Sequence, residues 1–296
     1  MKGGPEVFIA GCGDVGARVA KLWAARGAAV SALARSGESA GRLSRLGIAP
    51  VRGDLDDPAT LRGIPPRGAF LYYLAPPPEG GETDPRARDF LAALPVGEEP
   101  AKAVYLGTTA VYGDSRGAWV TEETPAAPAT ARGKRRLDAE RAFLGWGRER
   151  GVPVVILRVS GIYGPGRLPV EAVRRGAPVV REGEAPWTNR IHADDLAAVC
   201  VAAMERGRDR AVYNVADGSP GTITQYYNAV ADLLGLPRPP AVSMEEARRA
   251  MSPGMLSYLS ESRRIDARRM REELGVTLRY PGLAAGLPSC LAKEGG

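Results

Sequence analysis

Short apolar runs alternate with longer stretches of helical periodicity through the first part of the chain. The first such pair is an apolar run at 6–10 and a segment at 14–26, in which Val15, Val19 and Leu22 share one helical face. Further strands are expected at 28–34, 49–53, 69–74, 103–106 and 153–159, and a helix at 132–150. Apolar strands separated by helices are typical of a parallel sheet with helices on both faces. The sequence therefore predicts an α/β fold built on a doubly wound parallel sheet.

A glycine-rich segment joins the first expected strand to the first expected helix. Residues 7–16 read Val-Phe-Ile-Ala-Gly-Cys-Gly-Asp-Val-Gly, so a GxGxxG pattern stands in the strand–turn–helix context that dinucleotide binding requires. In this pattern Gly11 permits a tight turn, Gly13 lets a pyrophosphate approach the backbone, and Gly16 allows close packing of helix on strand. Free N–H groups at the helix start face the anion. We expect a Rossmann-like cofactor site that also includes the loop residues Cys12, Asp14 and Val15. A glycine-rich turn without a ligand is the alternative.

The end of the second expected strand carries information about which dinucleotide is bound. NAD-binding enzymes usually place Asp or Glu there to bind the ribose 2′-hydroxyl, whereas this chain has Arg35 followed by Ser36. A guanidinium suits a 2′-phosphate, so the sequence favours NADP(H) over NAD(H). The alternative for Arg35 is a surface position from which it stacks on adenine. After the third strand, Asp54 and Leu55 are expected beside the adenine, although Asp54 is equally suited to cap the following turn.

Four later segments occur in an order and spacing that point to one family. They are 104–113 (Val-Tyr-Leu-Gly-Thr-Thr-Ala-Val-Tyr-Gly), 157–166 (Leu-Arg-Val-Ser-Gly-Ile-Tyr-Gly-Pro-Gly), 190–196 (Arg-Ile-His-Ala-Asp-Asp-Leu) and 213–215 (Tyr-Asn-Val). Together with the glycine motif, they make the chain resemble an extended short-chain dehydrogenase/reductase of the NAD-dependent epimerase/dehydratase superfamily over nearly its whole length. The resemblance implies a Rossmann fold, a small C-terminal substrate domain and a nicotinamide cofactor.

The expected domain organisation follows from the place where the pattern changes. After Pro165 the alternation of strand and helix weakens, and helical segments predominate. We expect a dinucleotide-binding Rossmann domain over 1–165, joined by late sheet elements near 188–216. A mainly substrate-binding portion, interleaved with the first domain, is expected over 166–296.

The resemblance also implies roles for individual positions. Thr108 falls on the catalytic Ser/Thr position, where its hydroxyl would bond a substrate hydroxyl or carbonyl, and Thr109 is a less favoured substitute. The segment Leu74, Ala75 and Pro76 falls where the family contacts the cofactor ribose. The segment Ser160, Gly161 and Ile162 falls near the family's nicotinamide end. His192 falls at a structural position, and Asp194 and Asp195 are expected to cap the helix that follows it.

The chain departs from the family at its central Tyr-x-x-x-Lys pair. In the family, the tyrosine supplies a proton, and the lysine one helical turn away lowers the tyrosine's pKa and holds the ribose. The corresponding helix here has Arg132 at the tyrosine position and Arg136 at the lysine position. A guanidinium binds ribose or phosphate but does not release a proton near neutrality. Both arginines are therefore expected to bind substrate, and the usual acid–base group is missing. Lys134 and Tyr112 are weak replacements.

One further motif suggests a different chemistry. Residues 113–117 (Gly-Asp-Ser-Arg-Gly) match the G-x-S-x-G pattern of a hydrolase nucleophile elbow. The elbow requires a helix directly after the serine, whereas a polar, proline-broken loop follows here at 118–128. The single histidine, His192, belongs to another motif. A hydrolase with Ser115 as its nucleophile is therefore not expected.

The amino-acid composition further limits the functions and partners that this protein can have. Of the 296 residues, 44% are hydrophobic and 25% charged, and the three separated cysteines and single histidine suggest neither a disulfide framework nor a metal site. The net charge of +6 comes from arginines spread along the chain, which favours a solvated surface over a nucleic-acid partner. The N-terminus lacks a signal-peptide pattern, and the longest apolar run, 152–157, is too short to cross a bilayer. We expect a cytoplasmic protein with no membrane or nucleic-acid partner.

Two functions are compatible with these residues. The first is an atypical NADP-dependent oxidoreductase or epimerase/dehydratase-like enzyme, acting on a small polar substrate such as a sugar nucleotide or a carbonyl compound. The second is a non-catalytic NADP(H)-binding sensor or scaffold. The Thr108 hydroxyl favours the first, and the missing tyrosine and lysine favour the second. A homodimer formed through the helix at 132–150 is left open, because Leu137, Phe143, Leu144 and Trp146 there suit either a core or an interface.

Overall fold

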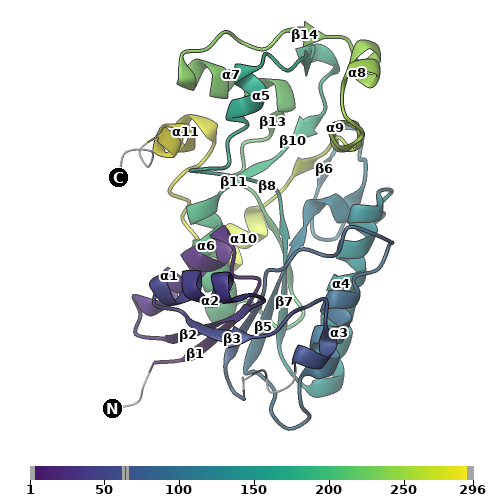
Figure 1. Ribbon diagram of the computed structural model, residues 1–296. Helices are drawn as coiled ribbons and strands as arrows, with labels where there is room; N and C mark the ends of the chain where they lie inside the picture. The colour runs from purple at the N-terminus through teal and green to yellow at the C-terminus, as the bar shows by residue number, and fades with distance from the viewer. Residues whose placement is uncertain (1–3, 62–63, 65–66, 292–296) are drawn as a thin grey trace.

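A seven-stranded parallel sheet forms the centre of the molecule (Figure 1). The computed structural model describes residues 4–61, 64 and 67–291. The spatial order of the strands is β12-β7-β5-β4-β1-β2-β3. Their bounds are β1 Glu6–Ala10, β2 Ala29–Ala34, β3 Ala49–Arg52, β4 Phe70–Tyr73, β5 Lys102–Thr108, β7 Val154–Val159 and β12 Val212–Val215. The predicted doubly wound sheet is confirmed, and the predicted strands differ from the observed ones only at their ends.

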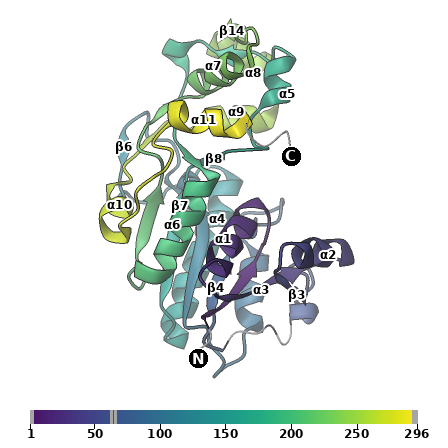
Figure 2. The same cartoon turned by 90° about the vertical axis from the view of Figure 1, so that its left-hand side faces the viewer.

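Helices cover both faces of this sheet (Figures 1 and 2). One layer consists of α1 (Asp14–Ala24), α2 (Gly37–Arg45), α6 (Ala193–Arg206) and α10 (Arg268–Leu274). The other consists of α3 (Pro85–Ala93) and α4 (Ala131–Arg150), preceded by the 3-10 turn η1 (Pro58–Leu61). The α4 residues Leu137, Phe143 and Trp146 are buried in the core, and Leu144 packs partly buried against it.

The remaining elements build a smaller part at the carboxyl ends of the strands. Its helices are α5 Val170–Arg174, α7 Ile223–Leu234, α8 Met244–Ala250, α9 Pro253–Leu259 and α11 Leu283–Leu291. Its short strand pairs are β8 Gly161–Tyr163 with β11 Arg190–His192, β9 Val179–Val180 with β14 Ala241–Val242, and β10 Trp187–Thr188 with β13 Gly221–Thr222. The 3-10 turn η3 (Glu182–Glu184) also belongs to this part, whereas the turn η2 (Thr109–Tyr112) follows β5 directly and packs in the core of the sheet. A separate apolar cluster that includes Val180, Val230 and Leu287 holds this part together.

The chain passes between the two parts more than once. After β11, helix α6 and strand β12 return to the sheet, and β12 forms its outer edge beside β7. Later, β15 (Arg264–Ile265) pairs with β6 (Trp119–Val120), and α10 packs against α6 and β12. Among the described residues, no helix has the length and apolar character needed to cross a membrane.

A buried polar network joins the strands to α4. The Arg158 guanidinium on β7 donates two hydrogen bonds, of 2.6 and 3.1 Å, to the carboxylate of Glu140 on α4. The same guanidinium lies over the ring of Tyr112, 4.8 Å from its centroid. The Tyr112 hydroxyl donates to Asn214 Oδ1 at 2.7 Å. Tyr112 is thus a buried packing residue, and burial raises the pKa of its phenol.

The start of α6 differs from the prediction. His192 occupies the N-cap position, and its Nδ1 accepts the backbone N–H of Asp194 at 3.1 Å. The prediction that Asp194 and Asp195 cap this helix was wrong, because both lie in its first turn. The Asp195 carboxylate instead accepts the backbone N–H groups of Arg279 and Tyr280, at 2.8 and 2.9 Å. It therefore fastens the segment before α11 onto α6.

Replacement of Glu140 by alanine removes one partner of the buried pair and leaves the Arg158 charge unpaired. Loss of one partner of a buried ion pair costs about 3–5 kcal/mol of unfolding free energy. We expect a decrease of this size in urea unfolding of Glu140→Ala. Glu149→Ala, at an exposed position on the same helix, should change stability by less than about 0.5 kcal/mol. Equal stability of Glu140→Ala and wild type would contradict the proposed role of the pair.

Candidate active site

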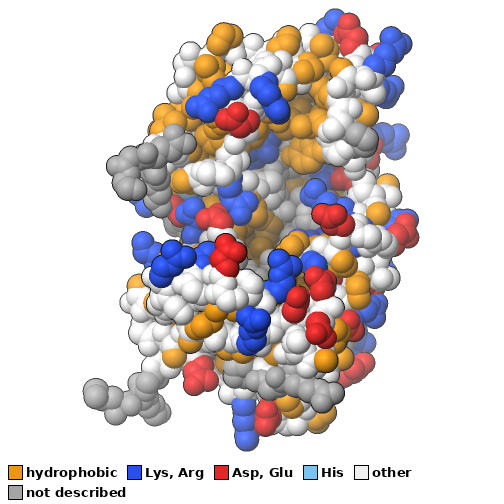
Figure 3. Space-filling view, viewed as in Figure 1, with side chains coloured by type: hydrophobic (Ala, Val, Ile, Leu, Met, Phe, Trp, Pro, Cys, Tyr) orange, Lys and Arg blue, Asp and Glu red, His pale blue; other side chains and the backbone are white. Residues whose placement is uncertain are grey.

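A cavity of about 460 Å³ lies between the sheet and the smaller part. Figure 3 shows the hollow in the surface between the lower and upper parts of the molecule. Its walls come from the carboxyl ends of β5 and β7, from the start of α4, from the segment 187–189 and from α9. The sheet order reverses between β1 and β4, and ligands of doubly wound sheets bind beyond the strand ends at such a switch point.

The three glycines after β1 have three different environments. Gly11 has a φ of +94°, and a Cβ placed on it would lie 2.4 Å from the backbone nitrogen of Ala75. A Cβ on Gly16 would lie 3.1 Å from the carbonyl oxygen of Gly11, so α1 packs closely on the loop. A Cβ on Gly13 would meet nothing within 4 Å. The first and third glycines therefore shape the loop, and the second leaves open space at the start of α1.

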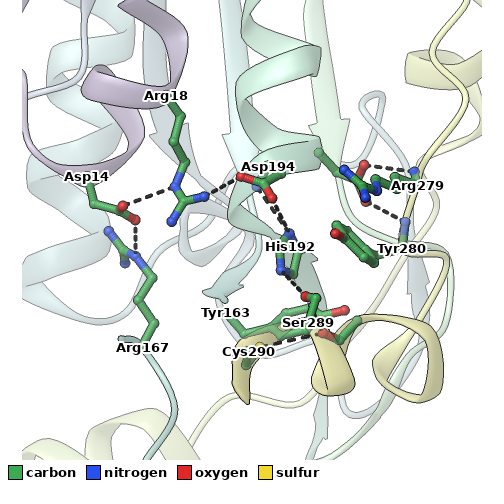
Figure 4. A network of polar contacts seen from close by, with 12 residues as sticks. Asp14, Arg18, Tyr163, Arg167, His192, Asp194, Arg279, Tyr280, Ser289 and Cys290 are labelled. Carbon is green, nitrogen blue, oxygen red and sulfur yellow. Dashed lines mark hydrogen bonds and ion pairs between the residues drawn. The ribbon is translucent and has the colours of Figure 1, made fainter. Parts of the chain in front are cut away.

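A chain of ion pairs surrounds that helix start (Figure 4). Asp14, the first residue of α1, accepts from Arg18 at 3.0 Å and from Arg167 at 2.7 Å. Arg18 also pairs with Asp194 on α6. Burial raises the pKa of Asp14, but the hydrogen bonds and charges of the two arginines outweigh it and leave the pKa below its usual value. The Asp14 carboxylate, which would repel a phosphate at this helix start, is thereby neutralised.

His192 lies at the end of the same network. Its Nε2 is 3.1 Å from the hydroxyl of Ser289, and its ring packs against Tyr163 and Tyr280. Burial lowers the pKa of His192, so the neutral ring is favoured. The histidine joins α6 to α11 and has a structural role.

Basic groups border the loop on the side of β2 and α2. Arg35 follows β2 and is exposed. Ser36 caps α2, and its hydroxyl accepts the backbone N–H of Ser39 at 3.2 Å. Arg42 on α2 donates a hydrogen bond from Nη2 to the carbonyl oxygen of Cys12 at 2.5 Å. No motif in the sequence indicates this contact. Cys12 is buried, and burial raises the pKa of its thiol to about 11.

The segments after β3 and β4 lie on either side of the switch point. Asp54 Oδ1 accepts the backbone N–H of Asp56 at 3.0 Å. This carboxylate therefore caps the turn that follows β3, which is the second of the two roles predicted for it. Leu55 packs partly buried against the core of the sheet. After β4, Leu74 and Ala75 are buried, and Pro76 lines the cavity. Val15 lies on the buried face of α1.

Two residues with hydroxyl side chains, Thr108 and Ser160, lie at the carboxyl ends of the neighbouring strands β5 and β7 and line the cavity. Thr108 of β5 is paired in register with Val159 of β7, so Ser160 comes directly after its partner. Thr108 Oγ1 accepts the backbone N–H of Ala110 at 3.2 Å, and its own proton has no acceptor among the described residues. Ser160 Oγ is buried without a hydrogen-bond partner in the described part of the chain. Gly161 and Ile162 continue the same wall.

The predicted arginines of α4 both line the cavity. Arg136 donates from Nη1 to the carbonyl oxygens of Leu106 and Ala75, at 3.1 and 3.3 Å, and so spans the ends of β5 and β4. Arg132, one turn earlier, is exposed on the rim. Lys134 pairs with Glu82 at 2.6 Å and does not belong to the wall.

Residues far along the chain complete the wall and carry no motif that would reveal them. They are Trp187, Thr188, Asn189, Tyr258, Glu261 and Arg263. Arg263 pairs with Glu261 at 2.8 Å and donates to the carbonyl oxygen of Gly113 at 2.6 Å. Ser115 lies in a loop whose backbone bonds to Ser262, and no helix directly follows it. The hydrolase elbow is therefore absent at this serine.

Comparison with known proteins assigns the family. The family model described as "NAD dependent epimerase/dehydratase family" matches residues 7–216, which include the glycine loop, Thr108, Ser160 and β12. The chain belongs to this family. The predicted resemblance is thus confirmed, and the family binds a nicotinamide nucleotide cofactor.

Individual proteins are similar to this chain over all or part of its length. A conserved protein of unknown function from Silicibacter pomeroyi has a solved structure with a TM-score of 0.83; it is 32% identical, and the match covers 99% of this chain and 100% of that one. The protein YeeZ of Escherichia coli is 28% identical over 61% of this chain, which spans 59% of that relative's length. A 4-hydroxy-2-methyl-3-oxo-4-farnesyl-3,4-dihydroquinoline-1-oxide ketoreductase of Stigmatella aurantiaca is 26% identical over 76% of this chain and 72% of its own.

The residues present fit a nicotinamide dinucleotide. The open space at Gly13 and the N–H groups at the start of α1 suit a pyrophosphate, and the neutralised Asp14 does not oppose it. Pro76 and Ser160 to Ile162 line the cavity, and the buried Leu74 and Ala75 directly precede Pro76 after β4.

Substitution of Gly13 separates binding from folding. A Cβ on Gly13 meets no protein atom within 4 Å and would occupy the open space at the start of α1. We therefore expect Gly13→Ala to fold normally but to lose the rise in melting temperature that a nicotinamide dinucleotide such as NADPH is expected to give the wild type. Gly11→Ala, in contrast, forces a Cβ against Ala75 and should unfold at much lower temperature without any ligand. Thermal melts with and without NADPH measure both effects. A full NADPH shift in Gly13→Ala would contradict this placement of the pyrophosphate.

Proposed function

We propose that the chain is an NADP(H)-dependent oxidoreductase or epimerase/dehydratase-like enzyme acting on a small polar substrate, a carbonyl compound or a sugar nucleotide. The observation that carries this proposal is the pair of hydroxyls, Thr108 and Ser160, at the floor of the cavity where β5 and β7 end. Both have unused hydrogen-bonding capacity among the described residues. A protein that only binds the cofactor has no need of such a pair.

The preference for NADP(H) is supported by the charges around α2. Arg35 stands where an NAD-binding site would have a carboxylate, and it is followed directly by the N-terminus of α2. A guanidinium beside free backbone N–H groups suits a 2′-phosphate. Arg42, which reaches the loop carbonyl of Cys12, adds a second positive charge on this side.

The chain's own residues would bind and orient the substrate. A bound nicotinamide supplies a hydride donor or acceptor at the cavity. Thr108 would donate its proton to a substrate oxygen, because its own oxygen is already used by Ala110. Arg132 on the rim would attract an anionic or oxygen-rich group, while Arg136 holds the ends of β4 and β5 in place.

The alternative is a non-catalytic NADP(H)-binding sensor or scaffold. The observation that favours it is the lack of a phenol or ammonium group on the cavity face of α4. The two proposals differ in turnover, since only the enzyme oxidises NADPH in the presence of a substrate.

Cofactor choice can be measured by thermal melts with NADPH, NADP⁺, NADH and NAD⁺. A ligand at about 100 times its dissociation constant adds about 2.7 kcal/mol to stability. For a chain of this size, we expect a rise of about 5–10 °C with NADP(H). Arg35→Asp should weaken the shift with NADP(H) but not that with NAD(H), whereas Arg45→Asp, at the far end of α2, should leave both unchanged. No shift with any of the four nucleotides would contradict both proposed functions.

The role of Thr108 can be tested by turnover. Removal of one hydrogen-bond donor that acts on developing charge slows catalysis by about 10²-fold or more. NADPH oxidation, screened over carbonyl compounds and sugar nucleotides, should therefore fall by this factor in Thr108→Val and be largely kept in Thr108→Ser. Both variants should keep the NADPH thermal shift. NADPH binding without turnover across the panel would favour the sensor.

A further inference from the structure

The distribution of tyrosines singles out one phenol. The chain has ten tyrosines, and nine of them are buried: Tyr72, Tyr73, Tyr105, Tyr112, Tyr163, Tyr213, Tyr226, Tyr227 and Tyr280. Tyr258 is only half-buried, and it is the one tyrosine in the cavity wall among the described residues. It is therefore the phenol available in the wall of a cavity to which α4 contributes arginines and no tyrosine.

Tyr258 is held there by its helix. The next residue of α9, Leu259, is buried in the apolar cluster of the smaller part. Tyr258 itself packs, partly buried, against the same cluster and also lines the cavity. A Cβ placed on Gly161 would lie 3.7 Å from the Tyr258 hydroxyl oxygen. The phenol oxygen thus lies close to Gly161, the residue that follows Ser160 in the cavity wall.

The guanidinium of Arg190 also lies close to Gly161. The same Cβ on Gly161 would be 3.0 Å from Nη1 of Arg190. Arg190 is buried, stacks over the ring of Tyr226 at 3.7 Å and donates to Thr188 Oγ1 at 3.3 Å. The Tyr258 hydroxyl and a fixed guanidinium therefore both lie next to Gly161.

Among the described residues, the cavity wall also holds two carboxylates: the exposed Glu79, and Glu261, which comes three residues after Tyr258. One oxygen of the Glu261 carboxylate accepts a hydrogen bond from Arg263 at 2.8 Å, so this side chain is already held in an ion pair. Its other oxygen, Oε1, is buried without a partner among the described residues and suits a substrate hydroxyl that donates to it. A donor of protons is therefore better sought in Tyr258 than in Glu261.

We propose that Tyr258 is the proton donor and acceptor of this active site, in place of the tyrosine that α4 lacks. The inference rests on the proposed oxidoreductase function. In reduction, the carbonyl carbon accepts a hydride with its electron pair from the reduced nicotinamide, and the C=O π bond breaks. The carbonyl oxygen takes the proton of the Tyr258 hydroxyl, so an alcohol forms. The phenolate then recovers a proton from water, which reaches it because Tyr258 is half-exposed. Oxidation of an alcohol runs through the same steps in reverse.

The first arm of the test needs no substrate. Tetranitromethane nitrates accessible tyrosines, so peptide mapping should find nitration mainly at Tyr258. NADP⁺ at about 100 times its dissociation constant fills nearly all sites and should slow this nitration by about tenfold or more. Adenosine 2′,5′-bisphosphate, which lacks the nicotinamide half, should raise the melting temperature but leave Tyr258 reactive.

The outcomes of this arm separate the two proposals. If NADP⁺ raises the melting temperature but does not protect Tyr258, the placement of the phenol is wrong and the proposed cofactor site stands. If Tyr258 is not nitrated in the free protein, the placement is also wrong. If NADP⁺ neither binds nor protects, the proposed function itself fails.

The second arm uses any substrate that the NADPH oxidation panel identifies. General acid–base catalysis contributes about 10²–10⁴-fold, so Tyr258→Phe should lower kcat by that factor with little change in KM. Its NADPH thermal shift should equal that of the wild type. Tyr227→Phe, which removes a hydroxyl in the same part of the protein but away from the cavity, is the matched control. Turnover by Tyr258→Phe at the wild-type rate, with an unchanged pH profile, would overturn the assignment.

Discussion

The buried pair of Arg158 and Glu140 is the interaction on which the geometry of the cavity depends. Two charges removed from water must find each other, because either one alone would be strongly destabilising. Their contact fixes how α4 is rotated against β7. Arg132, Arg136 and Glu140 are spaced four residues apart and lie on one face of α4. The rotation that satisfies Glu140 therefore also turns both arginines to the cavity.

The same pair acts on the strand side. The Arg158 guanidinium lies over Tyr112, which ends the turn that begins directly after Thr108, and Tyr112 in turn bonds Asn214 on β12. Asn214 Nδ2 donates to the carbonyl oxygen of Asp266 at 3.1 Å, in a segment that returns from the smaller part. One polar network thus connects β7, β12, the η2 turn after β5, α4 and the late part of the chain. A change in it is expected to disturb the substrate side more than the glycine loop.

The sequence was most informative where local chemistry alone determines structure. The apolar runs in the sequence located the strands. The tight turn at Gly11 and the close helix packing at Gly16, both predicted from the motif, are seen in their contacts with the end of β4 and with the loop after β1. It was least informative where a role depends on distant parts of the chain. His192 caps α6 through a ring nitrogen, which residue preferences do not predict. Tyr258 lies about a hundred residues from the strand end it faces, and only the folding of α9 against its own apolar cluster brings it there.

Helix α4 contributes arginines and no tyrosine to the cavity, and this determines what each wall can do. In a site with a tyrosine on this helix, one wall supplies both the proton and the contact to the ribose. Here the α4 wall is cationic and holds strand ends, while the phenol comes from α9 on the opposite side, with Arg190 beside it. A substrate between these walls would have its negative or oxygen-rich groups turned to α4 and its reacting oxygen turned to α9. Because α9 belongs to the smaller part, acid–base chemistry in this protein would depend on how that part is seated against the sheet. Asp195 and Asp14 secure that seating from α6 and α1 by binding the backbone of Arg279 and Tyr280 and the side chain of Arg167.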